Sequence, residues 1–116
     1  MQYEELEPIS REMAREELAC GDEVRVSRAL VRLALFDPDR RWLEELLARF
    51  LSDQRPQVRG VAATCVGHLA RIHKRINLEV LKPKLERLLD DQEIGGKAAD
   101  ALDDIETFVK VRNITT

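Results

Sequence analysis

The chain has 116 residues and a formal net charge of -3, with 44% hydrophobic and 35% charged residues. This composition is typical of one globular domain over residues 1–116, and the acid excess disfavours direct nucleic-acid binding. No apolar run approaches the roughly 18 residues of a membrane span, and the acidic N-terminus lacks signal-peptide features, so we expect a cytoplasmic protein that makes no membrane contact.

The first predicted element is a helix pair over residues 9–36, broken at Gly21-Asp22. Its second helix carries apolar residues at helical spacing, namely Val24, Val26, Leu30, Val31, Ala34 and Leu35. This spacing predicts an amphipathic helix with one buried face. The chain has only one Trp, one Tyr and three Phe, and such an aliphatic composition favours packed helices over a β-sandwich.

The second predicted pair covers residues 40–75, after the turn Asp37-Pro38-Asp39. In its second helix, one face gathers the apolar residues Val58, Val61, Ala62, Cys65, Leu69 and Ile72. Gly60 and Gly67 lie seven residues apart on the flank of this helix. Because each glycine costs about 1 kcal/mol of helix propensity, we expect them to permit the close approach of a neighbouring helix.

The third predicted pair covers residues 77–112, with Asn77 as a candidate N-cap. Its first helix superposes on that of the second pair with a shift of about 38 residues, which matches Trp42 with Val80, Leu43 with Leu81, Leu47 with Leu85 and Leu51 with Leu89. The alignment predicts that these positions, Trp42 included, lie in the core. We therefore predict an all-α fold, a short α-solenoid of three antiparallel helix pairs.

The middle pair contains Asp53, Val58-Arg59 and Ala62-Ala63, and the last pair contains Pro83, Asp91 and Ala98-Ala99. These residues give the chain a resemblance to the HEAT-repeat family. Pro83 would otherwise be anomalous, since a proline inside a helix removes a hydrogen bond. The sequence departs from the family pattern at Glu45, where a proline is expected, and at Ile94-Gly95, where Val-Arg is expected.

The resemblance to HEAT repeats implies that the second helices line a concave surface. It also implies an ion pair between Asp53 and Arg59 that links neighbouring turns. Because unrelated functions share such folds, the resemblance predicts architecture and leaves function to be argued from the surface residues.

The residues that could support chemistry do not form a recognisable site. His68 and His73 are five residues apart and point to different sides of a helix, and Cys65 with His68 lacks a third ligand, so we expect no metal. No Ser or Cys nucleophile motif and no phosphate-binding loop occurs. We predict no cofactor and no enzymatic activity, and we interpret Cys20 and Cys65 as reduced core thiols.

Charge placement is the informative surface feature. Arg25, Arg28 and Arg32 form a stripe opposite the apolar face of the first pair's second helix, and Arg59 could extend it. Asp100, Asp103 and Asp104 form an acidic stripe on the last helix. A surface that is basic at one end and acidic at the other suits a protein partner. The alternative is that both stripes are ordinary solvated faces, with arginines pairing to Glu16, Glu17 or Glu23.

The leading functional hypothesis is a non-enzymatic protein-binding module. In its size, acidity and lack of catalytic motifs, the chain resembles a bacterial immunity protein. Such a protein would act as a monomer that binds and blocks a toxin, such as a nuclease, through the acidic stripe. The alternative is a HEAT-type scaffold or regulatory subunit that bridges host proteins. A HEAT-like DNA glycosylase is the remote alternative, since it needs a basic groove. The polar residues at both ends of the chain favour a complete small protein.

Overall fold

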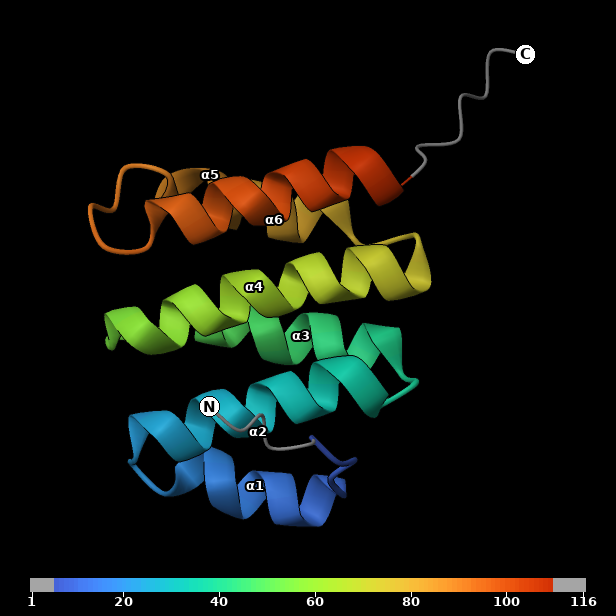
Figure 1. Ribbon diagram of the computed structural model, residues 1–116, viewed down its shortest axis with the longest axis vertical. Helices are drawn as coiled ribbons and strands as arrows, with labels where there is room; N and C mark the ends of the chain where they lie inside the picture. The colour runs from blue at the N-terminus through green and yellow to red at the C-terminus, as the bar shows by residue number, and fades with distance from the viewer. Residues whose placement is uncertain (1–5, 110–116) are drawn as a thin grey trace.

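The computed structural model describes residues 6–109, which form six α-helices. These are α1 (Arg11–Ala19), α2 (Glu23–Phe36), α3 (Arg40–Phe50), α4 (Pro56–His73), α5 (Leu78–Leu88) and α6 (Gly95–Phe108). Successive helices form antiparallel pairs that stack on one another (Figure 1). The predicted all-α fold of three helix pairs is confirmed. The predicted repeat ranges, of which 77–112 extends past the described residues, stay a prediction.

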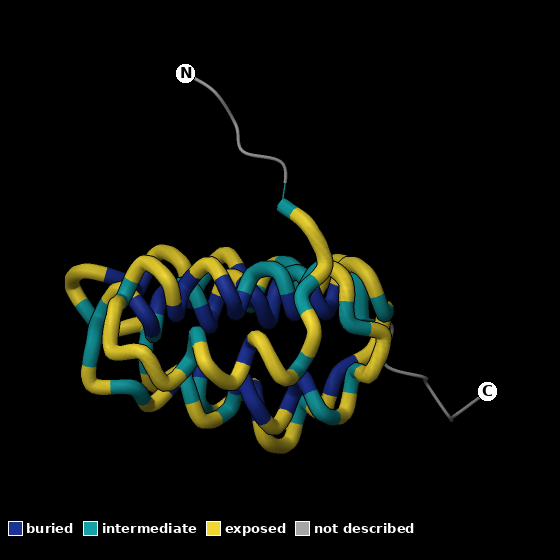
Figure 2. Tube along the Cα trace, turned by 90° about the horizontal axis from the view of Figure 1, so that it is seen from below, coloured by how far each residue is buried: buried dark blue, intermediate teal, exposed yellow. Residues whose placement is uncertain are grey.

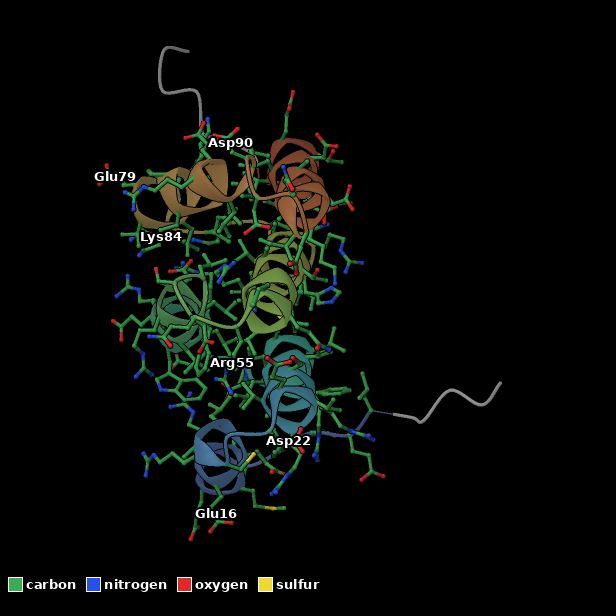
Figure 3. All side chains as sticks on the ribbon, turned by 90° about the vertical axis from the view of Figure 1, so that its left-hand side faces the viewer. Glu16, Asp22, Arg55, Glu79, Lys84 and Asp90 are labelled. Carbon is green, nitrogen blue, oxygen red and sulfur yellow. The ribbon has the colours of Figure 1, made fainter. Side chains whose placement is uncertain are left out.

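The helices form two layers, one of α1, α3 and α5 and the other of α2, α4 and α6 (Figure 3). Buried residues face each other between the layers (Figure 2). Helix α4 packs extensively against both α2 and α6, whereas contacts between α3 and α5 are much sparser. The α2–α4–α6 layer is therefore tightly packed, and the opposite layer leaves grooves between its helices.

Short polar side chains begin the first three helices. Ser10 accepts a hydrogen bond from the Met13 N–H at 3.1 Å, and Asp22 accepts one from the Val24 N–H at 2.9 Å. Asp39 accepts one from the Trp42 N–H at 3.2 Å. Each bond satisfies an amide that has no partner inside its helix, which is why these residues favour N-cap positions.

Helix α5 begins with a different arrangement from the one that the sequence suggests. Asn77 occupies the N-cap position, but its side chain makes no capping hydrogen bond. Its backbone N–H donates to the buried carboxylate of Glu44 on α3 at 2.9 Å, and the same carboxylate accepts from Arg40 at 2.6 Å. Glu44 thus joins the second helix pair to the third. Helix α5 continues through Pro83, whose ring lies on the exposed face.

Both glycines of α4 lie against the third helix pair, which agrees with the predicted close approach of a neighbouring helix. A Cβ atom placed at Gly60 would be 3.0 Å from the Ile94 side chain. One at Gly67 would be 2.5 Å from the Asp104 carboxylate and 3.6 Å from the Ala101 backbone. The absence of side chains at these two positions lets α6 approach α4 closely.

Gly67→Leu is expected to reduce the free energy of unfolding by about 1–3 kcal/mol, because the new side chain would be forced into this seam. Urea unfolding followed by circular dichroism measures the loss. Thr64→Leu, at an exposed position of the same helix, is the matched control and should change stability little. Equal stability of the two variants would contradict the close packing of α4 on α6.

Several apolar side chains that the periodicity places in the core are exposed instead. Val24 is 65% exposed, Ile72 48%, Val80 45% and Leu89 43%. Trp42 is only partly buried at the edge of the core. The apolar face of a helix is wider than the surface that its neighbours cover, because a helix in a three-pair stack has few neighbours. The core prediction is therefore wrong at these positions.

Candidate partner-binding surfaces

The predicted basic stripe lies on α2, but its three arginines differ in their surroundings. Arg25 is exposed and forms an ion pair with Glu17 of α1, with a closest N–O distance of 2.5 Å. Arg32 is half-buried and donates to the backbone carbonyls of Glu7 and Pro8 at 2.7 and 3.0 Å. Arg28 is exposed. Arg25 and Arg28 therefore lie exposed on the surface of α2, while Arg32 fixes the segment that precedes α1.

The predicted acidic stripe lies on α6, and its three aspartates also differ in their exposure. Asp100 and Asp103 are exposed, whereas Asp104 is half-buried with its carboxylate turned toward Gly67 of α4. Burial and the positive charge of Arg71 lower the pKa of His68, and Asp104 opposes this shift. His68 also contacts the Arg71 guanidinium through its ring nitrogen. Asp100 and Asp103 are thus the exposed members of the stripe.

Arg59 is tied into the fold and does not extend the basic stripe. Its guanidinium donates to the Asp91 carboxylate at 2.9 Å and to the backbone carbonyl of Asp53 at 2.8 Å. The predicted Asp53–Arg59 ion pair is wrong, because Arg55 binds both carboxylate oxygens of Asp53 at 2.9 and 3.0 Å. Arg59 instead links the second helix pair to the third through Asp91.

The hydrogen bond from Arg59 to the Asp91 carboxylate predicts a pH-dependent contribution to stability. This bond is the main cause that lowers the pKa of Asp91 below its ordinary value of 3.8, and hydrogen bonds from the backbone N–H groups of Glu93 and Ile94 lower it further. A lowered carboxylate pKa stabilises the fold above about pH 4, and the stabilisation is lost as the pH falls through the folded-state pKa. Asp91→Asn should therefore lower Tm at pH 7 and lower it less at pH 3. A difference in Tm that does not change with pH would contradict this.

The two cysteines have opposite environments. Cys65 is fully buried in α4, and burial raises the pKa of its thiol to about 12. Cys20 is exposed at the end of α1, so the prediction that it lies in the core is wrong. Cys20 lies in the turn after α1, beyond the part of the sequence that has helical periodicity, which explains the error.

Thiol titration at pH 8 should therefore find one reactive cysteine in the native protein and two after denaturation, since the thiolate is the reactive species. The Cys20→Ser variant serves as the control and should leave no reactive thiol in the native state. Two thiols that react at similar rates in the native protein would contradict the burial of Cys65.

The larger grooves of the layer formed by α1, α3 and α5 were not revealed by the sequence. The groove between α1 and α3 has a volume of about 420 Å³, and its lining includes Arg11, Arg15, Trp42, Arg49 and Phe50. The groove at the N-terminal ends of α3 and α5 has a volume of about 500 Å³ and mixes charges, with Arg40, Arg41, Glu44, Glu45 and Arg75 in its lining. The spacing of Arg11 and Arg15 marks one rim of the first groove, but the sequence does not show that α3 faces it.

The described residues contain no group of three potential metal ligands. None of the helices in this part of the chain has the length and apolar character required to cross a membrane. The surfaces that stand out are therefore the charged faces of α2 and α6 and the grooves of the opposite layer.

The fold defines the protein as an all-α stack of three antiparallel helix pairs. No protein-family model matches the sequence, and the comparison with curated proteins finds no match. A chain in the crystal structure of a CDI complex from Cupriavidus taiwanensis LMG 19424 is 33% identical, with a TM-score of 0.82. The match covers 95% of this chain and 99% of that chain. This protein belongs to the same family as that component of the CDI complex. The resemblance to HEAT repeats stays a prediction.

Proposed function

We propose that this protein is the immunity component of a toxin–immunity pair, a non-enzymatic protein that binds a cognate toxin and blocks its activity. The observation that carries the proposal is the match, over nearly the full length of both chains, to a component of a contact-dependent inhibition complex. We further propose that it is a cytoplasmic monomer until it binds the toxin.

The proposed mechanism is occlusion of the toxin's active site by the charged face of the α2–α4–α6 layer. Exposed Asp100 and Asp103, with Asp104 beside them, would occupy the basic site of a nuclease as phosphates do. At the other end of the stack, Arg25, Arg28 and Arg32 belong to the same layer, and Arg25 and Arg28 would orient the complex. Opposite charges at the two ends would favour a single docking orientation.

The test uses the purified protein encoded next to this gene as the candidate toxin. Wild-type protein should protect growing cells from that toxin and bind it tightly in calorimetry. The Asp100/Asp103/Asp104→Asn variant should bind at least about tenfold more weakly, since charge complementarity contributes to such interfaces. The matched control is Glu16/Glu79/Glu86→Gln, which removes the same charge from exposed positions of the opposite layer.

Failure of the wild-type protein to bind and protect would overturn the immunity proposal. If affinity purification instead recovers a housekeeping complex that both variants bind equally, the protein is a scaffold. Binding and protection that survive the aspartate substitutions would leave the immunity role intact and exclude the acidic stripe from the interface.

A further inference from the structure

The groove between α1 and α3 has the composition of a protein-binding site. Its floor is apolar and includes two aromatic rings, and its rim carries three arginines. The lining residues are Arg11, Ala14, Arg15, Leu18, Ala19, Trp42, Leu46, Arg49 and Phe50. Tryptophan and arginine are among the residues most enriched in those that dominate binding energy at protein interfaces.

The charge of this groove is of one sign. No carboxylate is among its lining residues, whereas the groove between α3 and α5 contains Glu44 and Glu45. Arg15 and Arg49 are exposed, and neither forms an ion pair with any residue in the described range 6–109. Two guanidinium groups are thus available for carboxylates of a partner, although the chain as a whole is acidic.

Arg11 holds α1 and α3, the two helices that form the groove, in place. Its guanidinium bonds to Asp37 at 3.1 Å and Asp39 at 3.2 Å, and it lies 4.0 Å from the centre of the Trp42 ring. These contacts come from α1, from the α2–α3 turn and from α3, so they fix the two helices relative to each other. A groove with a fixed shape loses less conformational entropy when a partner binds.

We propose that this groove binds an acidic segment of the cognate toxin that carries an apolar side chain. The apolar side chain would pack between Trp42 and Phe50, and carboxylates of the segment would pair with Arg15 and Arg49. This inference rests on the proposed function for the existence of a toxin partner. It adds a second contact surface, on the layer opposite to the charged face of α2, α4 and α6.

The sole tryptophan of the chain gives a readout that is specific to this groove. Protein labelled with 5-fluorotryptophan should show one ¹⁹F resonance, from Trp42, and addition of the unlabelled purified toxin should shift it. Calorimetry with Arg15→Glu/Arg49→Glu should show at least about tenfold weaker binding than wild type, because like charges would then oppose each other. The matched control, Lys82→Glu/Arg87→Glu on α5, should bind within about twofold of wild type, since exposed sites outside an interface contribute little.

The outcomes separate the two proposals. If wild-type protein does not bind the toxin, the proposed function fails and this inference fails with it. If the toxin binds but the Trp42 resonance does not move and Arg15→Glu/Arg49→Glu binds normally, the groove is not a contact surface and the immunity role stands. Circular dichroism and Tm of each variant show whether weaker binding reflects loss of the fold.

Discussion

Leu81→Ala is expected to lower the free energy of unfolding by about 2–5 kcal/mol, the usual cost of truncating a leucine in a core. Leu81 has 0% exposure and belongs to the core cluster between the two helix layers. Its removal would leave a cavity because α5 is held on one side by α6 and on the other by α3, and neither can collapse into the space without losing its own contacts.

The neighbouring residue supplies the control for this prediction. Val80 is 45% exposed on the same helix, so Val80→Ala should change stability by about 0.5 kcal/mol or less. Urea unfolding followed by circular dichroism compares both variants with wild type. If Val80→Ala proves the more costly substitution, α5 is rotated about its axis by one residue relative to the structure described above.

Gly95→Ala is expected to destabilise the protein by about 1–3 kcal/mol, whereas Gly96→Ala should not destabilise it. A Cβ atom at Gly95 would lie 2.5 Å from the carbonyl oxygen of Leu89 and 3.3 Å from its carbonyl carbon. Both are backbone atoms of the turn between α5 and α6, so the turn itself would have to move. At Gly96 the space within 4 Å is open, and alanine restores helix propensity at no steric cost.

Thermal unfolding of the two single variants beside wild type makes this comparison. The pair is well matched because the same methyl group is added at adjacent positions of one helix. A lower Tm for Gly96→Ala than for Gly95→Ala would mean that α6 begins one residue away from its described start. Equal Tm values for all three proteins would mean that the turn yields easily.

The two proposed contact surfaces lie on opposite layers of the stack, which has a consequence for the toxin complex. A toxin that uses both must reach around the stack, or use one surface for its folded body and the other for an extended segment. The charge-reversed and charge-neutralised variants address the two surfaces separately. Their effects on binding should add, because distant sites without shared partners are independent.

The six helices and their pairing could be predicted from the sequence because the signals are local. Apolar residues at helical spacing, capping residues such as Asp22 and Asp39, and the turn at Gly21 each act within a few positions of the chain. Gly60 and Gly67 also predicted the close approach of another helix, since a glycine inside a helix needs a packing reason.

Which residues form the candidate binding surfaces could not be predicted in full from the sequence and was decided by the tertiary structure, because these surfaces combine residues from different helices. Periodicity fixes which face of a helix is apolar, but the rotation and offset of that helix against its neighbours decide which residues meet. Arg59 therefore binds Asp91, 32 positions along the chain, while nearby Arg55 takes the carboxylate of Asp53. For the same reason Asp104 turns toward Gly67, and Arg15 and Arg49 line one groove.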